Sequence, residues 1–234
     1  MVDPELNREE CPDSYSGWGE LTAVVDNDVV KKGVCYGLEA LLWPPQAGRV
    51  PIGILGAARY VVAGAIRRLN LRGDQAQALS ALSSFAAIAQ ELEPSDHEVG
   101  IAAEMEEVAQ RANLALGSGE SQLAAIAVMR GIPEFHTGDK RAIAAMELTL
   151  KMLSDLSVLA GRVYCLEQLL LRLLDAAEDE SAIIASVCAE PHVDRSLSIC
   201  FGCYSGGAIA STAREGLASY ITVLRRSAPQ LLAA

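Results

Sequence analysis

The stretch Cys188–Cys203, with the sequence CAEPHVDRSLSICFGC, is the part of the chain that offers chemistry most directly. Thiolates and imidazole nitrogens are preferred ligands of tetrahedral zinc, and this stretch contains four such side chains: Cys188, His192, Cys200 and Cys203. The C-x2-C spacing of the last two suits zinc, and the first two are four residues apart, about one helical turn. Zinc at these four residues is therefore one hypothesis for this chain.

The surroundings of this stretch favour a structural interpretation instead. Pro191 directly precedes His192 and predicts a helix end, while Asp194 is placed to cap the next helix. Cys200 and Cys203 lie in an apolar, glycine-rich segment, where free cysteines usually act as small buried hydrophobes. A redox C-x-x-C requires a βαβ setting, which the sequence pattern does not indicate. We therefore expect a helix junction without a cofactor and keep zinc as the alternative.

The sequence shows no recognisable catalytic constellation. Asp26 and Asp28 could suggest calcium, but no ligand follows at EF-hand spacing, so we interpret them as a solvated turn. We interpret the acidic cluster of Glu104, Glu106 and Glu107 as the solvent-exposed face of a helix. The chain has no phosphate-binding glycine motif, no G-x-S-x-G elbow and no helical histidine motif for a metal. These observations favour a protein that is not an enzyme.

Composition narrows the class of protein further. The 234 residues are 51% hydrophobic but only 5% aromatic, so the core is built mainly from aliphatic residues, and the abundant Ala and Leu favour helices. A net charge of −11 argues against nucleic-acid binding, which needs clustered Lys and Arg. The polar, acidic N-terminus does not resemble a secretory signal. Six cysteines then indicate free thiols in a reducing compartment. We expect a cytoplasmic protein, with export by a dedicated machine left open.

Residues Val50–Ile66 form the strongest candidate for a membrane segment. The run is short for a span and carries Arg59 near its middle, so a membrane span is not expected. A buried or amphipathic helix is the better interpretation of these residues.

Apolar periodicity and capping residues divide the chain into predicted helices. The prolines at positions 44, 45 and 51 predict a rigid connector. Asp74 is expected to cap a helix, and Ser95 with Glu98 forms a capping box. The expected helices cover residues 52–71, 75–92, 95–116, 121–130, 139–177 and 195–226, with shorter ones between them.

The longest expected helix, residues 139–177, is apolar on more than one face and is predicted to lie at the centre of the molecule. The predicted fold is all-α: an irregular bundle of about seven or eight helices around this one. Residues 1–32 are expected to form a polar N-terminal appendage, and residues 33–234 a single α-helical domain.

A long helix with excess apolar surface, together with the missing catalytic constellation, predicts a non-enzymatic protein–protein interaction protein. It would be an adaptor, a chaperone-like protein, an effector or an assembly subunit, with a protein partner or self-association. The alternative is a helical enzyme or sensor that binds a ligand or metal near Cys188–Cys203.

Overall fold

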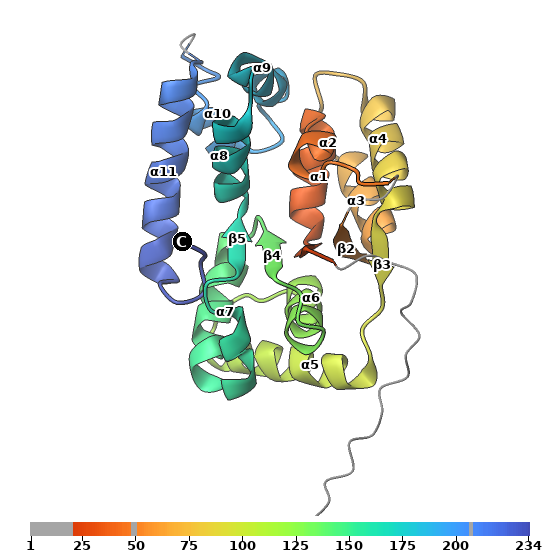
Figure 1. Ribbon diagram of the computed structural model, residues 1–234, viewed down its shortest axis with the longest axis vertical. Helices are drawn as coiled ribbons and strands as arrows, with labels where there is room; N and C mark the ends of the chain where they lie inside the picture. The colour runs from red at the N-terminus through yellow and green to blue at the C-terminus, as the bar shows by residue number, and fades with distance from the viewer. Residues whose placement is uncertain (1–20, 48–50, 206–207) are drawn as a thin grey trace, which may run out of the picture.

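A five-stranded parallel β-sheet runs through the centre of the molecule (Figure 1). The computed structural model describes residues 21–47, 51–205 and 208–234. The strands are β1 (Ala23–Val25), β2 (Ile52–Leu55), β3 (Gln90–Leu92), β4 (Glu134–Thr137) and β5 (Val163–Cys165). They lie side by side in the order β3-β2-β1-β4-β5, and every neighbouring pair is parallel. The prediction of an all-α helical bundle is therefore wrong, because the chain folds as an α/β protein.

Helices cover both faces of this sheet. In Figure 1, α5, α6 and α7 lie below it, and α1 to α4 lie above, beside α8 to α11. The helices are α1 (Asn27–Tyr36), α2 (Glu39–Leu42), α3 (Ala58–Ile66), α4 (Gln75–Ile88), α5 (Asp96–Arg111), α6 (Ser118–Met129), α7 (Lys140–Met152), α8 (Leu166–Ala176), α9 (Glu180–Ala189), α10 (Arg195–Cys200) and α11 (Ala210–Ser227), with a 3-10 helix at Ser154–Leu159.

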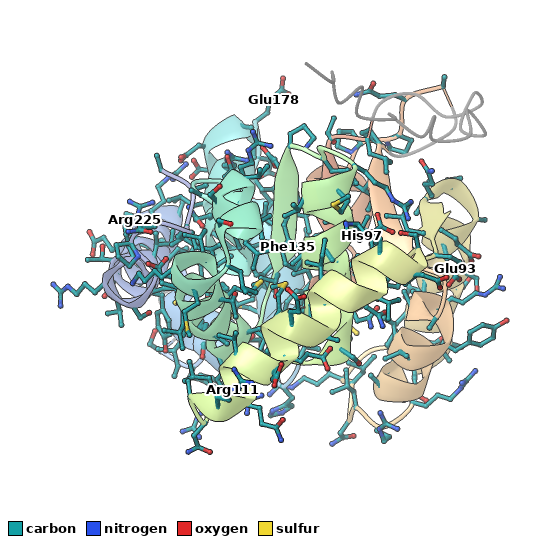
Figure 2. The ribbon with its side chains drawn as sticks, turned by 90° about the horizontal axis from the view of Figure 1, so that it is seen from below. Glu93, His97, Arg111, Phe135, Glu178 and Arg225 are labelled. Carbon is teal, nitrogen blue, oxygen red and sulfur yellow. A yellow bond between two sulfur atoms is a disulfide. The ribbon has the colours of Figure 1, made fainter. Side chains whose placement is uncertain are left out.

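The sheet separates two hydrophobic cores. Successive strand side chains point to opposite faces, so Ala23 and Val25 of β1 belong to one core and Val24 to the other. Phe135 of β4 is fully buried in the second core, near the middle of the molecule in the view from below (Figure 2). Because both faces of the sheet are covered, β1 and β2 are apolar and buried at every position and lack the alternating pattern of a half-exposed sheet.

Three of the strands, β2, β3 and β5, lie within stretches that were predicted to be helical. The expected helix 52–71 contains β2 and then α3, and the expected helix 75–92 contains α4 and then β3. A run such as Ile52–Leu55 is apolar at every position, so its pattern alone does not distinguish a buried strand from a buried helix.

The predicted central helix over residues 139–177 does not exist as one element. It consists of α7, the 3-10 helix, β5 and α8. Gly161 has a φ of 69°, a left-handed conformation that ends the helical path and turns the chain into β5. The apolar stripe continues across the break because β5 and α8 are buried as well.

Local signals were predicted more accurately than the sheet. Asp74 caps α4, Ser95 and Glu98 form the capping box of α5, and Asp194 caps α10, as the sequence indicates. These caps depend only on residues within one helical turn.

Two further predictions concern the N-terminal third of the chain. Within the described parts of the chain, no helix has the length and hydropathy of a membrane span. In the candidate segment Val50–Ile66, residues 52–66 form β2, a short turn and α3. Residues 1–20 of the predicted appendage lie outside the described residues, and residues 21–32 contain β1 and the first half of α1.

Candidate functional site at the carboxyl edge of the sheet

The strand order defines one place where the chain reverses its direction across the sheet. From β1 the chain proceeds to β2 and β3 on one side, and it then crosses to β4 and β5 on the other. The point of reversal lies between the neighbouring strands β1 and β4. In open parallel sheets, ligands bind outside the carboxyl ends of the strands at such a switch point.

Carboxylates occupy this point. Asp26 directly follows β1, Asp28 lies in the first turn of α1, and Asp139 follows β4 by two residues. Glu120, in the first turn of α6, joins them, since its charge acts on Asp26. The backbone N–H of Asp26 donates to the carbonyl of His136 in β4 (2.9 Å), which ties the ends of the two strands together.

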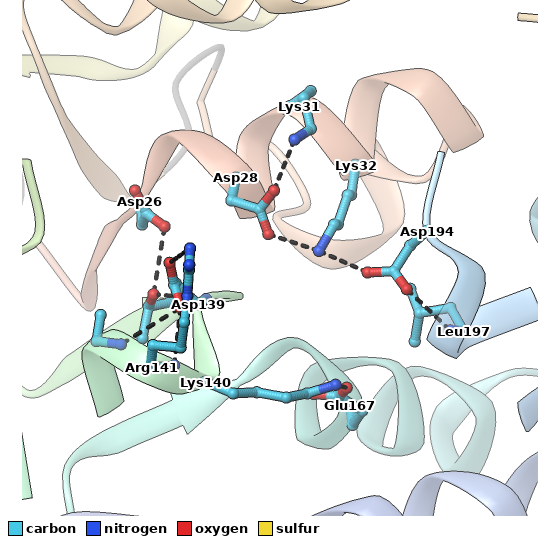
Figure 3. Close-up of polar contacts among 12 residues, drawn as sticks. Asp26, Asp28, Lys31, Lys32, Asp139, Lys140, Arg141, Glu167, Asp194 and Leu197 are labelled. Atoms are coloured by element: carbon cyan, nitrogen blue, oxygen red, sulfur yellow. Dashed lines mark hydrogen bonds and ion pairs between the residues drawn. The ribbon is translucent and has the colours of Figure 1, made fainter. Parts of the chain in front are cut away.

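Asp26 is the most buried of the carboxylates at this point. It is only 3% exposed, and one of its oxygens accepts a hydrogen bond from the Thr137 hydroxyl (3.2 Å; Figure 3). Burial, together with the charges of Glu120 and Asp28, raises the pKa of Asp26 to about 7. Among the residues that the structure describes, no Lys, Arg or His forms an ion pair with Asp26.

The pKa of Glu120 is raised as well. Burial raises its pKa, and the charges of Asp139 and Asp28 raise it further. Buried carboxylates whose pKa is raised by neighbouring negative charges favour either a bound proton or a bound cation.

Asp139 and Asp28, by contrast, are paired. Asp139 caps α7, accepting from the backbone N–H groups of Arg141 (2.8 Å) and Ala142 (3.3 Å), and its second oxygen lies 3.2 Å from the Arg141 guanidinium. Burial opposes the charged form of Asp139, but these bonds lower its pKa below the usual value. Lys32 and Lys31 similarly lower the pKa of Asp28 against the effect of its burial.

Gly138 allows this packing. A Cβ atom at position 138 would overlap the Asp28 carboxylate and would come within 3.4 Å of the Lys32 ammonium. The position therefore requires glycine for the close approach of α1 to the end of β4.

Two lysines at this edge have carboxylate partners of their own. Lys140 lies 2.7 Å from Glu167 at the start of α8 and stacks 4.4 Å from the centre of the Tyr220 ring. Lys32 bridges Asp28 (2.5 Å) and Asp194 (2.6 Å), which belongs to the segment before α10 (Figure 3). The site is thus connected to α8 and to the α9–α10 segment.

This arrangement can hold a hard cation. Mg²⁺ prefers carboxylate oxygens and usually takes one or two of them, with water and substrate phosphates completing its shell. Within residues 21–47, 51–205 and 208–234, no three side chains of His, Cys, Asp or Glu form a ready-made metal cage. Asp26 and Asp139 are the carboxylates that follow β1 and β4, where a simpler, two-carboxylate site would lie.

The four residues predicted for zinc are arranged differently. Cys188 and Cys203 form a disulfide with their Cα atoms 5.1 Å apart, which corrects the prediction of free thiols for this pair. Cys200 is free and buried, and His192 is exposed. A disulfide has no thiolates to offer, so zinc at these residues would require the reduced chain and stays a prediction. The predicted helix junction is confirmed, with Asp194 as the cap of α10.

The sequence contained a signal for the carboxylate site that the initial interpretation missed. The apolar run TAVV is followed directly by Asp26, and the short segment EFHT is followed by Asp139 after one glycine, which places an acidic residue at the end of each of these strands. Only the recognition of both runs as parallel strands places the two residues at one edge. Glu120 carries no comparable signal.

Comparison of the chain with protein-family models, with characterised proteins and with solved structures finds no match. The function must therefore be argued from the site itself.

Proposed function

We propose that this protein is a divalent-cation-dependent hydrolase of phosphate esters, with its site at the carboxyl ends of β1 and β4. The observation that carries the proposal is Asp26, a buried carboxylate at the switch point that has neighbouring carboxylates and no cationic partner among the described residues. A cation bound beside Asp26 would offset the burial and the neighbouring negative charges that raise its pKa.

The surroundings favour an anionic substrate that arrives with the cation. Asp26, Glu120 and Asp139 stand at the N-terminal ends of α1, α6 and α7, where helix dipoles attract negative charge. The carboxylates already present repel a free phosphate, whereas a bound cation would reverse that repulsion. The exposed guanidinium of Arg141 at this edge can donate to phosphate oxygens. A dinucleotide is disfavoured because the chain lacks the glycine-rich phosphate loop.

The residues divide into two roles. Asp26 and Asp139 would hold the cation through carboxylate oxygens, and a cation bound there would neutralise phosphate charge and lower the pKa of a water molecule. Glu120 accepts a proton from that water, because its raised pKa brings it closer to the working pH of a general base. The oxygen of that water forms a bond to phosphorus as the bond to the ester oxygen breaks, and the proton held by Glu120 passes to the leaving oxygen.

The earlier expectation of an interaction protein stays untested. Its main support was a single long apolar helix over residues 139–177, and the chain there forms four elements instead. A protein partner or self-association, and the cytoplasmic location, stay predictions.

Hydrolysis of two chromogenic probes, 4-nitrophenyl phosphate and bis(4-nitrophenyl) phosphate, tests the proposal with Mg²⁺ or Mn²⁺ and with a chelator. We expect cation-dependent release of nitrophenol, reduced about 100-fold or more by Glu120→Gln. Glu107→Gln, on the exposed face of α5, is the matched control and should leave the rate unchanged. Equal activity of the Glu120→Gln variant, or hydrolysis that survives the chelator, contradicts the proposal.

A second pair of variants tests the cation ligands. Asp139 and Asp74 both cap helices, and asparagine caps a helix as well as aspartate does. Asp139→Asn should therefore weaken Mn²⁺ binding without unfolding the protein, whereas Asp74→Asn should leave Mn²⁺ binding unchanged. Equal affinities in the two variants would remove Asp139 from the site.

A further inference from the structure

A disulfide-closed segment lies next to the candidate site. Cys188, in α9, is joined to Cys203, just after α10, across a separation of 15 residues. Inside this segment, the Ser198 hydroxyl lies within hydrogen-bond distance of the carbonyls of Pro191 (2.7 Å) and Asp194 (2.9 Å), and the Tyr204 hydroxyl donates to Pro191 (3.2 Å). The disulfide and these bonds make residues 188–204 one compact unit.

The compact unit reaches the site through Asp194. One oxygen of Asp194 accepts from the Leu197 N–H (3.0 Å) as the cap of α10, and the other lies 2.6 Å from the Lys32 ammonium. The same ammonium lies 2.5 Å from Asp28 (Figure 3). Asp194 therefore uses one oxygen to hold its own helix and the other to hold a side chain of α1.

Lys32 makes this connection sensitive to small movements. It is only 7% exposed, and the charges of Asp28 and Asp194 raise its pKa against the effect of its burial. A buried ammonium that loses one of two carboxylates is left partly uncompensated. If Asp194 withdraws, Lys32 pairs with Asp28 alone and neutralises more of its charge.

The negative charge of Asp28 acts directly on the carboxylates of the candidate site. Its carboxylate packs against Gly138 at the end of β4, and its charge acts on both Asp26 and Glu120. A change in the pairing of Asp28 therefore changes the attraction of the site for a cation.

We propose that Lys32 and Asp194 are positioning residues for Asp28, and that the Cys188–Cys203 disulfide holds this pair in place, so that reduction of the disulfide weakens cation binding at the candidate site. The proposal rests on the proposed function and adds a means of regulating it. The regulator would be a dithiol reductant. Both cysteines are partly exposed, which gives a small thiol access to the bond.

The redox step balances as a thiol–disulfide exchange. A thiolate of the dithiol attacks one sulfur of the Cys188–Cys203 bond, which breaks, and the other cysteine leaves as a thiolate and takes up a proton. The second thiol of the dithiol then displaces the first cysteine. The dithiol ends as a disulfide, and the protein ends with two thiols.

Two measurements on the full chain test the proposal. Calorimetric titration with Mn²⁺ compares the oxidised protein with protein reduced by dithiothreitol and then freed of it anaerobically. NMR of the metal-free protein follows proton exchange of the Lys32 ammonium, whose protons the two carboxylates protect. We expect reduction to weaken Mn²⁺ binding about tenfold, as the loss of an outer-shell partner does, and to accelerate exchange at Lys32.

Variants separate the charge pair from the disulfide itself. Asp194→Asn keeps the cap of α10 but removes the charge, and it should behave like the reduced protein. Asp179→Asn, the equivalent change at the cap of α9, should behave like the oxidised wild type. The double variant Cys188→Ser/Cys203→Ser should show the Mn²⁺ affinity and the Lys32 exchange rate of the reduced protein, and neither should change when dithiothreitol is added.

The outcomes distinguish the two proposals. If the oxidised protein binds no Mn²⁺, the proposed function is contradicted. If proton exchange at Lys32 still changes on reduction in that case, the link between the disulfide and Lys32 is supported. If the rate of proton exchange at Lys32 is the same in both redox forms and in Asp194→Asn, the proposed link between the disulfide and Lys32 is wrong, even if Mn²⁺ binds.

Discussion

Among single residues, Asp26 matters most for the proposed chemistry, because the fold buries its carboxylate. Its position directly after β1 buries it, because α1 begins there and the end of β4 lies alongside. An unpaired buried carboxylate costs free energy, and the structure offers it only the Thr137 hydroxyl and local backbone as donors. Such a cost at a switch point is characteristic of a functional residue.

The raised pKa of Asp26 predicts how stability depends on pH. The folded protein holds this proton up to a pH of about 7, whereas the ordinary value is 3.8, so the stabilisation is complete below pH 3.8 and is lost as pH rises through 7. Asp26→Asn removes the titration. Relative to wild type, the variant should therefore gain on the order of 3 kcal/mol in free energy of unfolding between pH 4 and pH 8 without added cation.

Urea denaturation at a series of pH values checks this prediction. Asp74→Asn is the control, since Asp74 lies at an exposed helix cap and its variant should follow the wild-type profile. Parallel profiles for wild type and Asp26→Asn would show that Asp26 does not titrate near neutral pH.

Gly138 provides a second residue-scale prediction. Gly138→Ala places a methyl group against the Asp28 carboxylate, which must move away from the end of β4. We expect a loss of about 1–3 kcal/mol in stability and weaker Mn²⁺ binding. Gly100→Ala is the control, because nothing lies within 4 Å of its added Cβ in α5. Unchanged Mn²⁺ affinity in Gly138→Ala would separate Asp28 from the site.

At the scale of elements, the sequence predicts what depends on neighbours along the chain and misses what depends on distant pairing. The caps at Asp74, Ser95 and Asp194 are local, and all three were identified. The strands have only three or four residues, most of which are buried, and β2 and β3 lie close to helices along the chain, so each was predicted as part of a helix. The carboxylate site was missed for the same reason, since it exists only when β1 and β4 pair.

The capping box of α5 gives the element-scale prediction. The Ser95 hydroxyl accepts from the Glu98 N–H, and the Glu98 carboxylate accepts from the Ser95 N–H (2.7 Å) and pairs with Arg130 (2.8 Å). Ser95→Ala should lower the free energy of unfolding by about 1 kcal/mol. Ser84→Ala, at an exposed position inside α4, should change it by less than about 0.5 kcal/mol. Thermal unfolding of the two variants measures the difference, and equal melting temperatures would contradict the role of the cap.

At the scale of the whole molecule, two cores on opposite faces of one sheet position the site. The α9–α10 unit packs on the face that carries α1, through buried residues such as Val187, Leu197 and Phe201. The Cys188–Cys203 disulfide closes this unit and restricts the unfolded chain. Its reduction should cost about 3 kcal/mol for a loop of this length.

Chemical denaturation with and without reductant measures that contribution. The midpoint of the wild type should fall when dithiothreitol is added, whereas the Cys188→Ser/Cys203→Ser variant should show one midpoint under both conditions. If the denaturation midpoint of the wild type is the same with and without dithiothreitol, the disulfide does not contribute to stability.

Calorimetric titration of the oxidised protein with Mg²⁺ at pH 6 and pH 8, in two buffers of different ionisation enthalpy, tests the proposed cation site at Asp26. A cation that binds at Asp26 must displace its proton. We expect tighter binding at pH 8, proton release at pH 6, and the loss of both in Asp26→Asn. Binding that is absent, or that keeps the same affinity at both pH values and in Asp26→Asn, would contradict a cation site at the ends of β1 and β4.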